Sequence, residues 1–563
     1  MKKKFSIKNI ALSSILLLTS VSCTKLDQDF YTEVRPDVFF KTEKDIKSVV
    51  YRPFTHARWY VGEDRWMLQE YTADNFAIST KGRHWYNGGE NERFHYHKWT
   101  PDDAWISETW RGTLMGISLA LDAIADISKL DYTKFGLTNQ EQEVDLTQLN
   151  TLVAFHYLKG LDYFGGLPIY TSLEQEPVAR STEQETFDHT EKILKEAIQK
   201  LPAKQAGQKK DENIHKAAAA AMLAQLYFNA EAYIGKKMYA ECLQISKDII
   251  DQKYGFYQLD ADWFGPHDFT NNDSPELIWS VPSAFNKLEY NWFYKYFYHY
   301  NTNEYFNGNF EGWNGAHLTP SRKPDGTLYD YTLGSPFEKF DATDLRKKPY
   351  KYIGGGQYQG MFIVGPHLTP TGKVIVGGEE YNGKPLNFVD QVARFSEVGQ
   401  GKRYSNISQL PSKMSEGEEN TGIRLVKVPI PTATDRNLTW AADVPVIRLT
   451  EIYYMLAECE YRLGNAAEAV KLINTVRKRN FDGGVDPNPT TVANLTNDRF
   501  LREWSIEFLG EGRRRTDLIR WGVFTEGTWW DHTPSKSKYL TRFPIPNGAI
   551  SGNNKLNQNQ GYN

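Results

Sequence analysis

Cysteine is scarce in this chain, which has only three in 563 residues: Cys23, Cys242 and Cys459. Small exported domains that cannot build a sufficient core depend on several disulfides, and three cysteines cannot supply such a framework. Cys242 and Cys459 both fall within helical patterns, so we predict that they are packing thiols. The chain must therefore be stabilised mainly by its hydrophobic core, and its length allows several domains.

Long apolar runs are also lacking, except near the start. Lysines 2–4 precede a charge-free run, residues 10–22, which is shorter than the ~20 residues of a spanning helix. A basic start followed by a short apolar run is typical of a secretory signal peptide, here residues 1–22. Cys23 follows directly and resembles the lipidated cysteine of a bacterial lipobox, although Ser20 stands where leucine is usual. We predict lipidation of Cys23; the alternative is ordinary cleavage that leaves a spare thiol.

Neither an excess of positive charge nor a familiar catalytic motif is present. The formal net charge is −4 at pH 7, and loss of residues 1–22 would remove lysines but no acids, so we expect no nucleic-acid partner. No zinc-protease, nucleophile-elbow, redox or dinucleotide motif stands out. His95 and His97 alternate as two metal ligands might, but no third ligand is evident, and we predict solvated side chains. We therefore expect no enzyme, no cofactor and no metal, while a glycosidase carboxylate pair stays open.

Several segments repeat apolar residues at every third or fourth position, which is the period of an α-helix with one buried face. Residues 149–164 are apolar nearly all round, which predicts a buried helix. Two helix pairs, within 217–250 and 446–479, share small residues where the helices would cross, as in tetratricopeptide-like pairs that stack around a common core. The other segments predicted as helices are 105–127, 183–201 and about 498–521.

The segment from about 260 to 440 differs from the helical blocks on either side. It is rich in glycine, asparagine, proline and aromatic residues, with short strand-like runs such as 361–364 and 373–376. An insertion of this length without regular structure is unusual unless it serves a function. We predict loops and short strands laid against a mainly α-helical scaffold.

Three groups of residues along the chain form motifs. They are Leu152-Val153-Ala154 with Phe164-Gly165-Gly166-Leu167-Pro168, Asn474-Thr475-Val476-Arg477-Lys478-Arg479, and Glu503, Glu507, Glu511-Gly512, Arg514, Asp517-Leu518 and Arg520-Trp521-Gly522. These motifs resemble those of the SusD/RagB family of outer-membrane nutrient-binding lipoproteins. The departures are Val153 and Trp504, each of which stands where the family usually has arginine.

The resemblance implies a single, mainly α domain at 23–563 built on tetratricopeptide-like helix pairs. It divides into an N-terminal part at about 23–230, the loop-rich ligand region at about 260–440 and a C-terminal part at about 441–563. Family members are lipid-anchored at the outer membrane, cap a TonB-dependent SusC-type barrel and deliver glycans to it. The RagB branch takes peptides instead, so a peptide ligand is the alternative. Two rival functions are a secreted glycosidase and a helical scaffold that binds only proteins.

The first candidate ligand site is a glycine-rich loop within 81–99. Its glycines exclude a regular helix and suggest an exposed loop. Aromatic side chains in such a loop are expected to pack against something, such as a ligand. An aromatic plate meets the apolar face of a sugar, while amide and guanidinium groups meet its hydroxyl rim. We predict that Arg83, Trp85, Tyr86 and Asn87 contact the ligand, and the family resemblance implies an aromatic platform at this place. The alternative is a loop packed beneath a neighbouring element.

The second candidate site lies between residues 290 and 313, where aromatic residues alternate among asparagines. The alternation over 292–298 could form a strand with one aromatic face. We predict ligand contacts at Trp292, Tyr294, Tyr296 and Trp313, although core packing would explain some of them.

The motif at 503–522 carries charged residues at helical spacing. A binding or catalytic cluster is one interpretation. An ion-pair network that fixes this helix against its neighbours is the better one, because helical faces often carry such pairs. We therefore predict structural roles for five of its members, which are Glu507, Arg514, Asp517, Arg520 and Trp521.

Overall fold

The computed structural model describes residues 39–562 apart from 210, 212, 290, 307–310 and 395–404. The predicted signal peptide and Cys23 lie outside the described residues. Within the described part, none of the helices combines the length and the apolar character needed to cross a bilayer.

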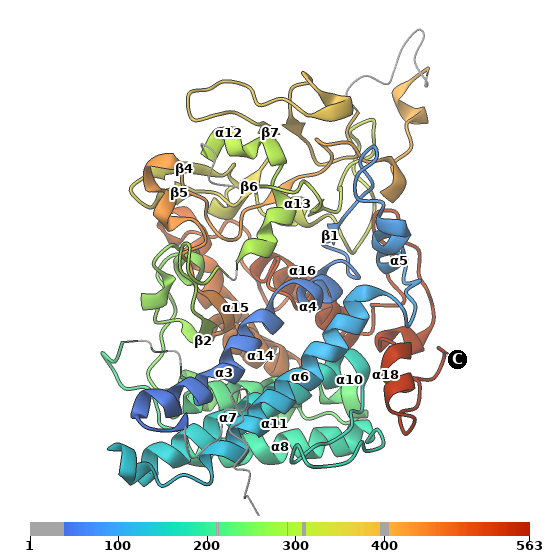
Figure 1. Cartoon of the computed structure of the whole chain (residues 1–563). Coiled ribbons are helices and arrows are strands. Elements are labelled where there is room, and N and C mark those ends of the chain that lie inside the picture. Colours follow the sequence, from blue (N-terminus) through green and yellow to red (C-terminus); the bar gives the residue numbers. More distant parts are fainter. Residues whose placement is uncertain are drawn as a thin grey trace, which may run out of the picture.

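Stacked helix pairs form the lower two thirds of the molecule in Figure 1. Each of α6, α7, α8, α9, α11, α14 and α15 packs against the next, so consecutive antiparallel pairs share one core. The predicted mainly α fold is thereby confirmed. The longer helices are α3 (Glu43–Val61), α4 (Glu63–Glu70), α6 (Ala104–Ile127), α7 (Asn139–Phe164), α8 (Glu183–Lys200), α9 (Lys216–Phe228), α11 (Tyr239–Ile250), α14 (Leu449–Arg462), α15 (Ala466–Arg477), α16 (Asn497–Glu507) and α17 (Arg514–Arg520). The short ones are α5 (Glu90–His95), α10 (Ala230–Ile234), α12 (Asn303–Phe306), α13 (Pro336–Lys339) and α18 (Asn547–Gly552).

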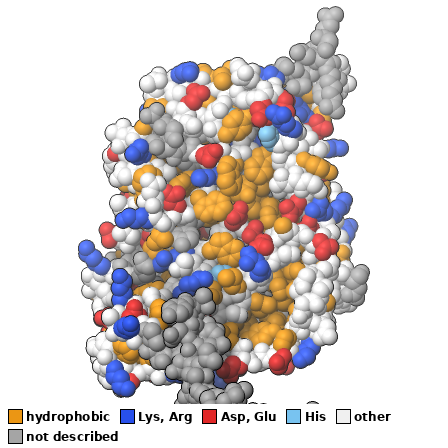
Figure 2. Space-filling view, viewed as in Figure 1, with side chains coloured by type: hydrophobic (Ala, Val, Ile, Leu, Met, Phe, Trp, Pro, Cys, Tyr) orange, Lys and Arg blue, Asp and Glu red, His pale blue; other side chains and the backbone are white. Residues whose placement is uncertain are grey.

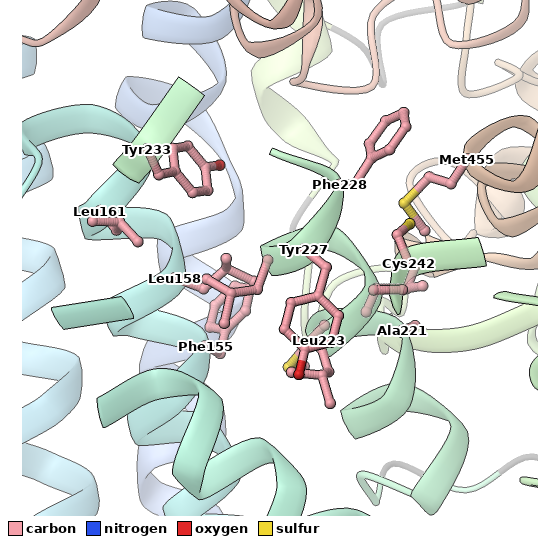
Figure 3. Close-up of a cluster of buried hydrophobic side chains, with 14 of the residues drawn as sticks. Phe155, Leu158, Leu161, Ala221, Leu223, Tyr227, Phe228, Tyr233, Cys242 and Met455 are labelled. Carbon is pink, nitrogen blue, oxygen red and sulfur yellow. The ribbon is translucent and has the colours of Figure 1, made fainter. Parts of the chain in front are cut away.

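The core of the scaffold is built where α7, α9, α11 and α14 meet (Figure 3). Phe155 and Leu158 of α7 point toward Tyr227 of α9, while Cys242 of α11 lies beside Met455 of α14. The alanines of α9 from 217 to 221 are all fully buried, and such small side chains let neighbouring helices approach closely. Cys242 and Cys459 are both free and buried, as predicted.

Most of the predicted loop-rich region forms the upper part of the molecule, whereas its first strand, β2, lies lower, beside the helices (Figure 1). It consists of 3₁₀ turns and two-stranded antiparallel sheets that join distant segments. The pair β1–β3, for example, places Phe76 opposite Leu318 and so ties the N-terminal part to the insertion. The pairs are β1 (Phe76–Ala77) with β3 (His317–Leu318), β2 (Leu277–Val281) with β10 (Val444–Arg448), β4 (Lys351–Gly354) with β5 (Gln357–Gln359), β6 (Phe362–Ile363) with β9 (Arg424–Leu425), and β7 (Gly365–Pro366) with β8 (Asn387–Phe388).

Three local predictions were wrong. The alternating aromatics at 292–298 form a 3₁₀ helix, Trp292–Phe297, instead of a strand. The C-terminal helix is two helices, because Gly510 and Gly512 adopt φ of 77° and 70° between α16 and α17. Left-handed backbone of this kind ends a right-handed helix, and glycine adopts it without steric cost. Residues 373–376 form only isolated bridges instead of a strand.

Candidate functional site

The loop from Lys81 to Gly89 rises above α5 and β1 (Figure 1). It begins with a tight turn in which Lys81 and His84 exchange backbone hydrogen bonds of 2.9 and 3.0 Å. Trp85 and Asn87 then adopt positive φ of 67° and 45°. A non-glycine residue held in this region costs about 1–3 kcal/mol and is frequent at binding sites. The loop is therefore held in one strained conformation by its surroundings.

Trp85 is seated by contacts on two sides. Its indole Nε1 donates a hydrogen bond of 3.0 Å to the backbone oxygen of Trp313. Its ring lies against Gly315, where an added Cβ would come within 2.9 Å of a ring carbon. The side chain is half-buried rather than fully exposed. Because the only indole donor is already used, Trp85 offers a ligand apolar ring contacts and no hydrogen bond.

Trp85 belongs to an aromatic cluster of four half-buried rings: Trp85, Trp292, Tyr296 and Trp313. The ring centroids of Trp85 and Tyr296 lie 5.3 Å apart, and those of Tyr296 and Trp313 lie 4.8 Å apart. Trp292 meets Trp313 edge-on at 5.6 Å. These are the spacings at which aromatic pairs stabilise one another, so the cluster forms a fixed apolar wall.

An open pocket of about 430 Å³ lies against this wall. Its size falls within the range of ligand sites, and it combines aromatic rings with a few polar groups. In Figure 2, hydrophobic side chains run down the middle of the visible face from its upper part toward the lower right, with acidic and basic side chains among them. The residues that line the pocket are Lys81, His84, Trp85, Asn87, Tyr300, Gly312, Trp313, Asn314, Glu379 and Glu419.

Glu419 is the buried carboxylate of the pocket. It accepts hydrogen bonds from His299 Nε2 at 2.8 Å, from the backbone N of Gly378 at 2.9 Å and from the Tyr300 hydroxyl. Burial by itself would raise the pKa of Glu419, but these hydrogen bonds outweigh it and the pKa is lowered. Burial also lowers the pKa of His299. The pair is thus a neutral imidazole that donates to a carboxylate.

Lys81 is the buried cation of the pocket. Its ammonium donates to the backbone oxygens of Gly315, at 2.6 Å, and Ser79, at 3.2 Å. Burial and the nearby guanidinium of Arg424 hold the pKa of Lys81 well below its ordinary value.

The rim of the pocket carries exposed charges. Arg83 Nε and His84 Nε2 both contact Glu379 Oε2, each at 2.7 Å, and the hydrogen bonds from Arg83 and His84 lower the pKa of Glu379. In the part of the chain that the structure describes, His84, Glu379 and Glu380 are the one group of three potential metal ligands within 4.8 Å of one another. The guanidinium of Arg83 already occupies the carboxylate that a cation would need.

His95 and His97 are not solvated, contrary to the prediction. Both are buried. His95 Nε2 contacts the backbone oxygen of Trp530 at 2.9 Å, and His97 Nε2 contacts that of Thr72 at 2.8 Å. His95 therefore ties this segment to one near residue 530, and His97 ties it to the residues that follow α4.

The structure brings most of the predicted ligand contacts together at one place. Trp85, Asn87 and Trp313 line the pocket, while Trp292 and Tyr296 form the wall behind it. Arg83 and Tyr86 are exposed at the same loop.

Tyr294 lies elsewhere. It is only 6% exposed, and its hydroxyl donates to the backbone oxygen of Gly510 at 3.1 Å. It packs against Trp66 and Phe293. The alternation along the sequence could not separate it from Tyr296, because a 3₁₀ helix turns side chains in three directions rather than two.

Six residues that line the pocket were not among the predicted ligand contacts: Lys81, His84, Tyr300, Asn314, Glu379 and Glu419. They come from segments about 340 residues apart, and only the fold brings them together. The local sequence held one clue, since Lys81 and His84 flank the predicted loop residues. Nothing in the pattern around Glu379 or Glu419 indicated a site.

The five residues predicted as structural lie away from this pocket. Asp517 accepts from Arg513 at 3.0 Å and from Arg520 at 2.8 Å. Arg514 binds Asp74 through two hydrogen bonds of 2.6 and 2.9 Å. The remaining contacts are Arg520 with Glu458, Glu507 with Arg346 and Arg448, and Trp521 under the guanidinium of Arg462.

Comparison with known proteins agrees with this architecture. The model of the SusD family matches residues 275–562, and a second family model, described as starch-binding associating with outer membrane, matches residues 29–228. The starch-binding protein SusD of Bacteroides thetaiotaomicron is 25% identical over 482 residues, which is 82% of this chain and 80% of that protein.

Solved structures share the fold. Surface glycan-binding protein A from Bacteroides thetaiotaomicron has a TM-score of 0.65 at 18% identity, covering 93% of this chain and 100% of that one. Its complex with laminarihexaose has a TM-score of 0.64 at 17% identity, covering 92% and 100%. Because one family model spans more than half of the sequence and a starch-binding relative aligns over most of it, the chain belongs to the SusD family.

Proposed function

We propose that this protein binds an oligosaccharide or polysaccharide in the pocket beside the aromatic cluster. The observation that carries the proposal is the wall of half-buried rings, Trp85, Tyr296 and Trp313, next to an open pocket of about 430 Å³. Sugar rings offer an apolar face to such a wall and hydroxyl groups to the polar groups around it. The starch-binding relative and the laminarihexaose complex of a structural neighbour support a glycan as ligand.

Binding without turnover fits the electrostatics of the pocket. A glycosidase needs one carboxylic acid that stays protonated near its working pH, together with a second carboxylate. The carboxyl groups that line this pocket, Glu379 and Glu419, both have lowered pKa values. Neither is suited to donate a proton to a leaving group, which supports a binding protein over an enzyme.

The family supports a place at the outer membrane. We propose that acylated Cys23 anchors the protein there, facing the exterior, and that a TonB-dependent SusC-type barrel receives the glycan. Copurification of a tagged protein with such a barrel from outer membranes tests the partnership. Recovery of the protein without any barrel under mild detergent would contradict it.

Ligand binding is tested by calorimetry and affinity electrophoresis with a panel of glycans and a panel of peptides. We expect saturable binding to at least one glycan, no binding of peptides and no new reducing ends after prolonged incubation. Binding of peptides alone would overturn the glycan proposal, and release of reducing sugar would show a hydrolase.

A further inference from the structure

The backbone of residues 313–316 supports the indole of Trp85. This segment is itself held against the aromatic 3₁₀ helix, because the backbone N of Ala316 donates a hydrogen bond of 2.7 Å to the backbone oxygen of Tyr296. Gly315 faces the indole so closely that an added Cβ would lie 2.9 Å from a ring carbon. The place of Gly315 therefore decides where the ring of Trp85 can lie.

The side chain of Lys81 joins this support to the loop that carries Trp85. Its Nζ donates a hydrogen bond of 2.6 Å to the backbone oxygen of Gly315. Its own backbone forms the tight turn with His84 that opens the loop. Both hydrogen bonds of Nζ go to backbone oxygens rather than to a carboxylate, and the residue is only 1% exposed. Lys81 thus holds two backbone segments together and offers almost no surface to a ligand.

The loop depends on such contacts for its conformation. Trp85 and Asn87 have positive φ, which persists in non-glycine residues only when the surroundings impose it. Asn91 fixes the backbone of Trp85, since its Nδ2 donates a hydrogen bond of 2.8 Å to the Trp85 oxygen. The ring is placed by other contacts, which are the hydrogen bond to Trp313 and the packing against Gly315. Of these, the packing requires that Gly315 stays beside the loop.

We propose that Lys81 is a positioning residue, which holds the indole of Trp85 through Gly315 in the orientation that a glycan meets. Its effect on affinity rests on the proposed function, because it concerns the same pocket. A ring that is ordered before the ligand arrives spares the free energy of ordering it during binding. Loss of the Nζ donor would leave the buried oxygen of Gly315 without this partner and loosen the ring.

The first test is a double-mutant cycle on the full mature protein, titrated with soluble starch and with laminarihexaose. Lys81→Met keeps an apolar side chain of similar length and removes the donor. We expect it to weaken the glycan that binds by about threefold to tenfold, as ordering of one side chain would. Added to Trp85→Ala, it should cause no further loss, because both changes act through the same ring. Additive losses would show that Lys81 acts apart from Trp85 and overturn the proposal.

Hydrogen exchange of the free protein is the second test and needs no ligand. In Lys81→Met we expect faster exchange of the backbone amides within 79–91, with unchanged protection of α9 in the scaffold. Unchanged exchange in the loop would refute the positioning role. Because this measurement is made without glycan, it stands even if neither glycan binds, a result that would count against the proposed function alone.

Lys427→Met is the matched control for removal of a buried lysine. Lys427 is 6% exposed at the side chain, pairs with Glu511 at 2.7 Å and does not line the pocket. We expect it to lower the melting temperature without changing glycan affinity. An affinity loss equal to that of Lys81→Met would show a general effect of destabilisation and contradict positioning at the loop.

Gly315→Ala changes the same contact from the other side, and it decides the matter if Lys81→Met does not fold. The added Cβ would displace the ring of Trp85, so we expect a loss of affinity of about threefold or more and no further loss in combination with Trp85→Ala. Unchanged affinity in folded Gly315→Ala would refute a ring held through Gly315.

Discussion

Trp85 combines two features that a core residue would not need together. Its backbone is held at a φ of 67°. Its indole packs against Gly315 and donates a hydrogen bond to the backbone oxygen of Trp313. The outward face of the ring is thereby presented in one orientation. A ligand does not have to order this side chain, so little of the binding free energy is spent on doing so.

We predict that Trp85→Ala weakens glycan affinity by about 1–3 kcal/mol, by analogy with bases stacked on aromatic rings. The half-buried ring and its hydrogen bond also predict a modest loss of stability in this variant. Calorimetric titration and thermal melting measure the two effects separately.

Trp263→Ala is the matched control for that variant. Trp263 is also half-buried and packs against Phe264 and Tyr358, but it does not line the pocket. We expect a similar loss of stability with unchanged affinity. Intact affinity in Trp85→Ala would remove Trp85 from the site.

At the scale of elements, α17 is held by buried charges on both of its ends. Asp517 lies between Arg513 and Arg520, and all three side chains are largely buried. The two guanidinium groups outweigh the effect of burial on Asp517 and hold its pKa below the ordinary value. Breaking a buried pair leaves an uncompensated charge, which costs far more than losing an exposed pair.

Asp517→Ala should therefore destabilise the protein by about 3–5 kcal/mol. Urea unfolding measures the loss, and ligand affinity per folded molecule should stay the same. Glu468→Ala, which removes a partly exposed carboxylate paired only with Lys471 at the surface, should have little effect. Unchanged unfolding with abolished binding in Asp517→Ala would contradict the structural role.

Glu70, the last residue of α4, binds the backbone that leads into α17. Its carboxyl accepts hydrogen bonds from the backbone N of Gly512 at 2.8 Å and of Arg513 at 3.2 Å, just before α17. Burial nevertheless raises the pKa of Glu70 to about 8 from an ordinary value of 4.5. The folded protein keeps this proton between pH 4.5 and about 8, whereas the unfolded chain loses it. The stability contributed by protonated Glu70 is thus complete below pH 4.5 and is lost as the pH rises toward 8.

We predict that Glu70→Gln flattens this dependence, since glutamine resembles the protonated acid and does not titrate. Between pH 4.5 and about 8, the unfolding free energy of Glu70→Gln should rise relative to that of the unmodified protein. The gain is at most about 1.4 kcal/mol per pH unit. Denaturant unfolding at a series of pH values checks it. Parallel curves for the two proteins would show that Glu70 is ionised in the fold.

At the scale of the whole molecule, we predict that Cys23 is the acylated N-terminus. The basic start and the short apolar run before it support this, and acidic residues follow closely. Cys23→Ala should release the protein from the membrane fraction and abolish incorporation of labelled fatty acid, because acyl chains contribute about 0.8 kcal/mol per buried methylene. Cys242→Ala serves as the control, since that thiol is buried in the core. Fatty-acid labelling of Cys23→Ala would refute the assignment.

The scaffold could be predicted from the sequence more completely than the site. Helices such as α6 and α8 follow from local periodicity, and their observed bounds differ from the prediction by one residue. The pocket depends on contacts between distant loops, so Glu379 and Glu419 gave no local pattern. The division between α16 and α17 was missed although Gly510 and Gly512 stand in the sequence, because the charged residues around them kept helical spacing.

The close packing of Trp292, Trp313 and Trp85 also gives this protein an optical reporter of its own. Indoles about 5–6 Å from another ring couple electronically, so a near-ultraviolet circular dichroism band should arise from this wall. A ligand resting on the exposed faces would change the polarity around the rings, and with it their fluorescence. Occupancy can then be followed in solution without any label, and the spectral change should disappear in Trp85→Ala.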